Sequence, residues 1–323
     1  MIDALRWFVP LAGCAIFGPA LLALAGFLYL TQPPRYVGRE TPATRGWDYE
    51  ELTLETSDGV RLHAWFIPAA LQTAGADGSA LPEGHPQGMA AANPATPDES
   101  GRTRPAIIMV HGYPFDKSDL LGVADDLHDT YDLLLFDLRS FGQSEGARTS
   151  LGHHERHDMI AATAYLQQRG IDRIGVWGFS LGGAVTLLTL PEAPSLRAAV
   201  VDSPFADLRT MALDYYHLPV VNHVLVFYTD LLSRLVFGTP LADVSPARAA
   251  AQADRPLLLI HGDQDTTIPP HHFEQLRSAL ADNGAAEFWL VAGSGHTQSH
   301  SSQPDLYRAR LRAFFAQHLG PSL

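Results

Sequence analysis

Arg173-Ile-Gly-Val-Trp-Gly-Phe-Ser-Leu-Gly-Gly183 is the stretch that decides the fold of this 323-residue chain. Ile174 to Trp177 is typical of a short buried strand, and Ala184 to Leu190 of a buried helix that ends before Pro191. Gly178-Phe-Ser-Leu-Gly182 lies between them and matches the G-x-S-x-G pattern. At a strand-to-helix corner this pattern predicts a serine whose hydroxyl is exposed above a sheet.

The same corner provides the chemistry that a nucleophile needs. Glycine at 178 and 182 leaves room for neighbouring elements around a strained backbone. The first N–H groups of a helix have no partner within the helix and carry the positive end of its dipole. The sequence therefore predicts that Ser180 is a nucleophile and that the Leu181 N–H stabilises an oxyanion. The alternative is a glycine-rich turn with a solvated serine.

Composition excludes several classes of protein. The net charge is −13, from 22 basic and 35 acidic residues, so we expect no binding to nucleic acid, which requires basic surface. Cys14 is the only cysteine, which excludes an intrachain disulfide and a cysteine-based zinc site. A hydrophobic content of 46% and this length suit one α/β domain with insertions.

The N-terminus predicts a membrane anchor. Residues 7–30 contain no charged side chain and exceed the ~20 residues that cross a bilayer. A single-pass transmembrane helix is therefore expected over 7–30, followed by a linker over 31–46. A cleaved signal peptide stays an alternative, as does lipoprotein processing at Leu11-Ala-Gly-Cys14. Both orientations of the span stay open.

The remaining chain, 47–320, is interpreted as one catalytic domain. Alternating runs around Asp58-Gly59 predict an antiparallel hairpin. Residues 69–104 are rich in alanine, glycine and proline without periodicity, which favours a disordered insertion. Residues 206–250 are apolar and helical in pattern. We interpret them as a cap over the site, with an ordinary pair of packed helices as the alternative.

Buried strands alternate with helices through this domain. Such alternation predicts a mostly parallel sheet with helices on both faces. The expected strands are 106–110, 133–136, 174–177, 198–201, 257–260 and 288–291, and the expected helices between or after them are 116–129, 153–169, 273–280 and 304–318.

Polar residues follow four of these strands. Ligands bind at the carboxyl ends of parallel strands, where we place Tyr113, Ser180, Asp265 and His296. His296 is the predicted base for Ser180, and Asp265 the carboxylate that orients the imidazole. The backbone N–H groups of Tyr113 and Leu181 are the predicted oxyanion donors.

Several alternatives to these residues exist. Asp263 and Asp202 compete with Asp265, although Asp263 is closer to its strand and more suited to capping the turn. His300 competes with His296, which the neighbouring glycines favour.

The other histidines are interpreted as structural. His111 and His261 each precede a glycine at a strand end. A metal site is the alternative for a further cluster, which we interpret as a helix N-terminus: His153, His154 and His157.

Six motifs occur in order over residues 47–318: His111-Gly-Tyr-Pro114, Asp137-Leu-Arg-Ser-Phe-Gly-Gln-Ser144, Gly178-Phe-Ser-Leu-Gly182, Asp202-Ser-Pro-Phe205, His261-Gly-Asp-Gln-Asp265 and Gly293-Ser-Gly-His296. Together they resemble the α/β-hydrolase superfamily and, within it, the membrane-anchored serine hydrolases of the Bem46/ABHD type. The resemblance implies an eight-stranded sheet and hydrolysis of esters, thioesters or amides without a cofactor or metal. Ser140 departs from the pattern, because related chains carry glycine there.

We therefore expect a membrane-tethered, lipase-like serine hydrolase. Its predicted substrates are carboxylic esters, either small molecules or acyl lipids, with thioesters as a variant. A small serine peptidase or aminopeptidase is one alternative, and a non-catalytic binding protein with a hydrolase fold is another. The sequence leaves the oligomeric state open.

Overall fold

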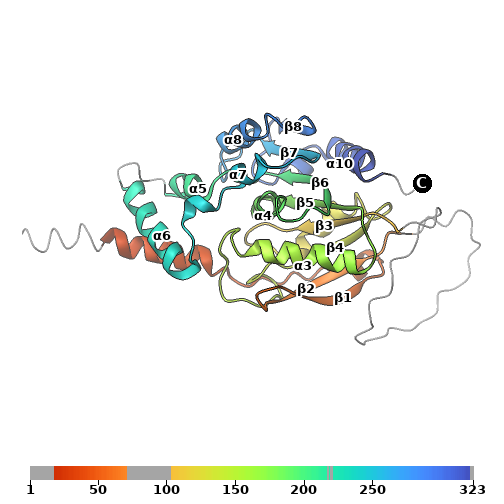
Figure 1. Cartoon of the computed structure of the whole chain (residues 1–323), viewed down its shortest axis with the longest axis horizontal. Coiled ribbons are helices and arrows are strands. Elements are labelled where there is room, and N and C mark those ends of the chain that lie inside the picture. Colours follow the sequence, from red (N-terminus) through yellow and green to blue (C-terminus); the bar gives the residue numbers. More distant parts are fainter. Residues whose placement is uncertain (1–17, 71–102, 217, 219–220, 321–323) are drawn as a thin grey trace, which may run out of the picture.

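A single twisted sheet lies at the centre of the molecule (Figure 1). The computed structural model describes residues 18–70, 103–216, 218 and 221–320. Eight strands follow the order β1-β2-β4-β3-β5-β6-β7-β8. Their bounds are β1 Glu50–Glu55, β2 Arg61–Ile67, β3 Ala106–Val110, β4 Asp132–Phe136, β5 Ile174–Phe179, β6 Leu196–Asp202, β7 Leu257–Gly262 and β8 Ala286–Val291.

The sheet is mostly parallel, as the sequence predicts. Strands β3 to β8 run parallel to one another, whereas β2 is antiparallel to both β1 and β4. Every residue of β3, β4, β5 and β7 is buried, as expected for parallel strands covered on both faces. In β7, Leu257 and Leu259 pack into one core, and Leu258 and Ile260 into the other.

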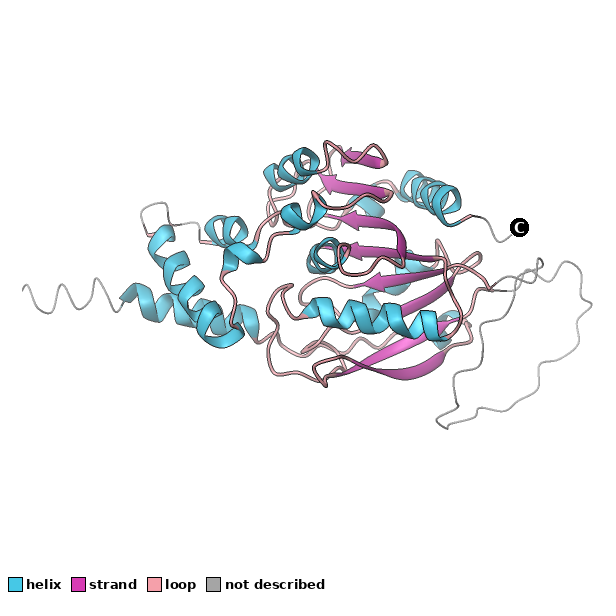
Figure 2. Cartoon of the chain, viewed as in Figure 1, coloured by secondary structure: helices cyan, strands magenta, loops and turns pink. Residues whose placement is uncertain are grey.

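Helices cover both faces of the sheet (Figure 2). Leu166, Leu187 and Leu276 bring α3, α4 and α8 into one core, and Leu121 and Leu311 bring α2 and α10 into the other. Besides the N-terminal helix Gly18–Thr31, the helices of the described residues are η1 Pro42–Arg45, η2 Lys117–Leu120, α2 Leu121–Ala124, α3 Glu155–Gln168, α4 Leu181–Thr189, α5 Leu208–Tyr215, α6 Asn222–Phe237, η3 Leu241–Asp243, α7 Pro246–Ala250, α8 His271–Ala279, α9 Ser299–Ser302 and α10 Pro304–Leu319.

The predicted helix over 116–129 is mostly wrong in extent. Only η2 and α2 are helical there. After α2 the backbone bonds are mixed: the N–H groups of Asp126 and Leu127 donate three residues back, whereas that of His128 donates four residues back. The three-residue bonds are tighter than those of an α-helix, and the chain turns toward β4 instead of extending α2.

The segment predicted as a cap contains α5, α6, η3 and α7. Figure 1 shows α5 and α6 beyond one end of the sheet. The inner side of α6 buries Leu225 and Val226, whereas Phe227 and Leu235 are exposed. Most of the predicted insertion 69–104 lies outside the described residues.

The predicted transmembrane span 7–30 is not supported by the described residues. They contain a helix over Gly18–Thr31, and residues 7–17 lie outside them. No single described helix is long and apolar enough to cross a membrane, although one bent pair, α6 with Leu241–Ala250, fits by length and composition. The helix Gly18–Thr31 buries Ala23 and Phe27, and the Phe27 ring lies 5.7 Å from that of Phe237. Some of its apolar side chains therefore pack against other parts of the protein, including α6. Hydropathy alone does not reveal this packing.

Candidate active site

Ser180 lies on the corner between β5 and α4. Its φ of 52° and ψ of −120° are unusual for a residue with a side chain. Its backbone N–H donates to the Asp202 carbonyl at 2.8 Å, which fixes the corner to β6. A Cβ at Gly178 would lie 2.6 Å from the Gly182 carbonyl oxygen. A Cβ at Gly182 would overlap the Val110 carbonyl oxygen. Only glycine fits these positions, so the motif glycines permit the close packing that supports Ser180.

Two hydrogen bonds connect Ser180 to His296 and Asp265. The Ser180 Oγ lies 3.0 Å from His296 Nε2, and His296 Nδ1 lies 2.7 Å from Asp265 Oδ2. Since the ionised carboxylate can only accept, Nδ1 carries the proton and Nε2 accepts from the serine hydroxyl. The other Asp265 oxygen accepts from the backbone N–H groups of Thr267 and Ile268. These bonds hold the carboxylate in place for the imidazole.

The competing residues lie in other networks. Asp263 accepts from the Gly293 N–H at 2.7 Å and caps that turn. Asp202 is buried, accepts from the Tyr307 hydroxyl at 3.1 Å, and has a pKa that burial raises. His300 bonds with Asp126 at 3.0 Å. The structure therefore brings Asp265 and His296, rather than these residues, to Ser180.

The loop after β3 passes directly beside Ser180. A Cβ at Gly112 would lie 2.9 Å from the Ser180 Cβ, so residue 112 must lack a side chain. His111 supports this loop: its Nε2 accepts from the Leu138 N–H at 2.9 Å, and its Nδ1–H donates to the Gly112 carbonyl at 2.8 Å. Burial lowers the pKa of His111, in keeping with the neutral ring that these bonds require. Tyr113 therefore comes directly after Gly112, the residue that packs against Ser180.

A second buried histidine supports the carboxylate loop. His261, at the end of β7, donates from Nε2 to the Ile268 carbonyl at 2.8 Å. That bond holds the segment in which Asp265 receives its backbone bonds. The assignment of His111 and His261 as structural from their strand-end positions agrees with this geometry.

The comparisons with known proteins agree with this architecture. The family model for the prolyl oligopeptidase family matches residues 142–322, more than half of the chain, including Ser180, Asp265 and His296. The chain belongs to the prolyl oligopeptidase family. It is accordingly a hydrolase of the α/β-hydrolase superfamily. The narrower Bem46/ABHD resemblance stays a prediction.

Relatives of this prolyl oligopeptidase family member share about a quarter of its residues. Protein YfhR of Escherichia coli K12 is 26% identical over 281 residues, covering 85% of this chain and 83% of YfhR. The α/β-hydrolase domain-containing protein WAV2 of Arabidopsis thaliana is 28% identical over 272 residues, covering 83% of this chain and 78% of WAV2.

Solved structures share the fold. A Pyrococcus furiosus esterase has a TM-score of 0.68 at 23% identity, over 90% of this chain and 100% of the esterase. A puromycin-hydrolyzing peptidase of Mycobacterium tuberculosis has a TM-score of 0.64 at 22% identity, over 88% of this chain and 42% of the peptidase. One fold therefore accommodates proteins named for ester and for peptide hydrolysis.

The N-terminal helix borders the candidate site of this family member, which the sequence analysis missed. The Tyr113 hydroxyl donates to the Tyr29 carbonyl at 3.3 Å. Burial raises the pKa of Tyr113, and the nearby phenols of Tyr29 and Tyr215 raise it further. These three tyrosines come from segments far apart in sequence, so no motif spacing could reveal their proximity.

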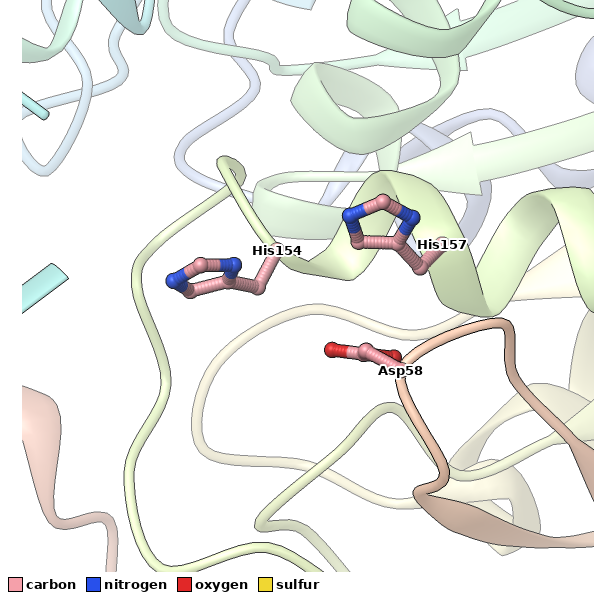
Figure 3. A group of neighbouring side chains, drawn as sticks. All are labelled: Asp58, His154 and His157. Carbon is pink, nitrogen blue, oxygen red and sulfur yellow. The ribbon is translucent and has the colours of Figure 1, made fainter. Parts of the chain in front are cut away.

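The histidine cluster at the start of α3 does not favour a metal ion in this family member. Figure 3 shows His154 and His157 above Asp58, with ligand atoms within 4.8 Å of one another. Both Asp58 oxygens already accept from Arg139, at 2.6 and 2.9 Å, and this guanidinium lowers the pKa of Asp58. A metal ion would face that cation at close range. His157 instead lies 3.2 Å from the Ser57 hydroxyl.

A second histidine pair connects α5 to α8. Asp214 Oδ2 lies 2.9 Å from His271 Nε2 and 3.0 Å from His272 Nε2. Since His272 Nδ1 accepts from the Ala206 N–H at 3.1 Å, its Nε2 carries the proton and donates to Asp214. A metal ligand needs an unprotonated nitrogen, so this group serves as a clasp between α5 and α8.

Proposed function

We propose that this hydrolase cleaves carboxylic esters through an acyl-enzyme on Ser180. The observation that carries the proposal is the hydrogen-bond chain from Ser180 through His296 to Asp265, at the N-terminus of α4. Such an arrangement activates a serine hydroxyl, which is otherwise a weak nucleophile at neutral pH.

Acylation follows from this geometry. The Ser180 Oγ attacks the ester carbonyl carbon as His296 Nε2 takes the hydroxyl proton. Asp265 stabilises the resulting imidazolium. The carbonyl oxygen becomes an oxyanion that accepts from the N–H groups of Leu181 and Tyr113. Collapse of this intermediate breaks the bond to the leaving alkoxide, which receives the proton from His296.

Deacylation repeats the sequence with water. His296 takes a proton from the attacking water, and the hydroxyl oxygen adds to the acyl carbon of the Ser180 ester. The same two N–H groups stabilise the second oxyanion. Its collapse releases the carboxylic acid and returns the proton to the Ser180 Oγ. These steps require no cofactor.

The surroundings of the site favour ester substrates with apolar acyl groups. Tyr113 lies on the loop that follows β3, with Tyr29 and Tyr215 close to it, and aromatic side chains are typical linings of apolar ligand sites. Family membership supports a second candidate, hydrolysis of small peptides or aminoacyl amides. A thioester would react by the same steps.

The test compares a p-nitrophenyl acyl ester series with aminoacyl p-nitroanilides, using the full chain. We expect faster ester hydrolysis, increasing from acetate to longer acyl chains, and labelling of Ser180 by a fluorophosphonate probe. Ser180→Ala should lose both labelling and at least ~10⁴-fold in kcat/KM.

A preference for the anilides would replace the ester proposal with peptide hydrolysis. Equal rates across the acyl series would remove the apolar acyl preference. A folded wild-type protein without labelling or turnover would support the non-catalytic alternative.

A further inference from the structure

Exposed apolar side chains gather on the N-terminal helix, on α6 and on the residues just before α6, at one end of the molecule. Of the seventeen large hydrophobic residues exposed in the described part of the chain, eleven belong to the N-terminal helix and to 215–236. We call this set the apolar platform. Its members are Leu21, Leu22, Leu24, Tyr29, Tyr215, Leu218, Val224, Phe227, Leu231, Leu235 and Val236.

Helix α6 is apolar on both sides. Its inner residue Leu225 is fully buried in the main core. Its outer residues Phe227 and Leu235 are 64% and 73% exposed, and Leu231 lies between them at helical spacing. A surface helix of a globular protein normally has a polar outer face. The outer face of α6 is therefore suited to an apolar environment.

The N-terminal helix extends the same surface. Phe27 packs against Phe237 of α6, and Leu21, Leu22 and Leu24 are exposed. Figure 1 shows the two helices beside each other at the end of the sheet. A groove of about 240 Å³ lies between them, lined by Ala20, Leu21, Leu24, Tyr228, Leu231 and Leu232.

The N-terminal helix and α6 carry almost no charge. Gly18–Thr31 has no charged residue, and α6 has only Asp230 and Arg234, whose side chains pair at 2.7 Å. Residues 7–17, which lead into the N-terminal helix, are also uncharged. A bilayer accepts such a surface at low desolvation cost, whereas a protein partner would be expected to meet a rim of polar residues.

We propose that the apolar platform docks on a lipid bilayer, with the outer face of α6 in the interface. The N-terminal helix then joins the bilayer to the candidate site, because its Tyr29 carbonyl accepts from the Tyr113 hydroxyl. An acyl substrate would reach Ser180 from the lipid side. This last step rests on the proposed ester hydrolysis, whereas the docking does not.

Because Cys14 is the only cysteine in the sequence, one substitution removes it and a new cysteine can be labelled at a chosen position. In a Cys14→Ser background, Leu235→Cys carries an environment-sensitive nitrobenzoxadiazole label on the platform. Leu306→Cys on α10, 45% exposed, carries the same label as the matched control. Each full-length protein is mixed with neutral phosphatidylcholine vesicles. We expect a blue shift and a several-fold increase in emission at 235, quenched by brominated lipid, and no change at 306.

Each other outcome overturns the proposal. A protein that binds vesicles with the label at 235 still in water would show that another segment makes the contact. A protein that does not bind vesicles would remove the bilayer as the occupant. A shift at 235 that follows protein concentration without vesicles would indicate a second copy instead. These readouts do not use turnover, so failure of the ester proposal stays distinguishable.

Discussion

The candidate site and the apolar platform lie close together but are built in opposite ways. At the site, short hydrogen bonds fix Ser180, His296 and Asp265, and buried histidines support the loops around them. On the N-terminal helix and α6 of the platform, exposed leucines and Phe227 form an apolar surface, and the only charged side chains, Asp230 and Arg234, pair with each other. Directional bonds give the first region its geometry, whereas the second depends on apolar area and tolerates variation of side chains.

The largest effect should come from Asp265→Asn. Loss of the charge that holds the His296 tautomer should lower kcat/KM for esters by about 10⁴-fold. Steady-state kinetics provide the measurement, and Asp263→Asn, which removes only a turn cap, is the matched control. Equal losses in the two variants would show that the site does not depend on the 265 carboxylate.

Leu225→Ala tests the inner side of α6. Leu225 is fully buried, so the cavity should reduce the free energy of unfolding by about 2–5 kcal/mol. Urea denaturation measures this change. A loss below about 1 kcal/mol would mean that α6 is only loosely attached to the core, and that the two sides of the helix are energetically alike.

The clasp between α5 and α8 should make stability depend on pH. Burial lowers the pKa of His272 to about 4, so between pH 6.5 and 4 the unfolded chain binds a proton that the native chain does not. The contribution of His272 to the free energy of unfolding is complete above pH 6.5. It is lost as the pH falls toward 4, and it amounts to on the order of 3 kcal/mol.

Urea denaturation at pH 7 and 4.5 should show a smaller difference in His272→Gln than in the wild type. His223→Gln is the control, because His223 is exposed on α6 and lies outside the group formed by Asp214, His271 and His272. Unchanged pH dependence in His272→Gln would assign the acid sensitivity to other groups.

Leu235→Ser should have the smallest effect in water. The side chain is 73% exposed, so the free energy of unfolding should change by less than about 0.5 kcal/mol. Vesicle binding, measured by flotation, should weaken although thermal unfolding stays the same. Substantial destabilisation in water would show that the outer face of α6 supports the fold rather than meeting lipid.

The sequence held more information about where Ser180, His296 and Asp265 lie than about the N-terminal helix. The strand-to-helix corner predicted Ser180, and the rule that parallel strands end at one edge of the sheet led to Asp265 and His296. The choice between Asp265 and Asp202 depends on the hydrogen bond from His296 to the carboxylate, which only the folded chain forms.

The N-terminal helix shows why the rest could not be predicted. Its uncharged sequence fits a membrane span, but Ala23 and Phe27 are buried against other parts of the protein. Hydropathy records how apolar a segment is and not what it contacts. The approach of Tyr29 to Tyr113 similarly joins distant segments, and no local pattern encodes it.

The position of β3 has a consequence for dissecting this protein. The match to the family begins at residue 142, and that portion alone includes Ser180, Asp265 and His296. β3 precedes it, yet pairs with β5 at the middle of the sheet and leads into the loop beside Ser180. A fragment starting at 142 would expose β5 as an unprotected edge, prone to aggregation. It would also lack one predicted oxyanion donor, so we expect such a fragment to lose both hydrolysis and solubility.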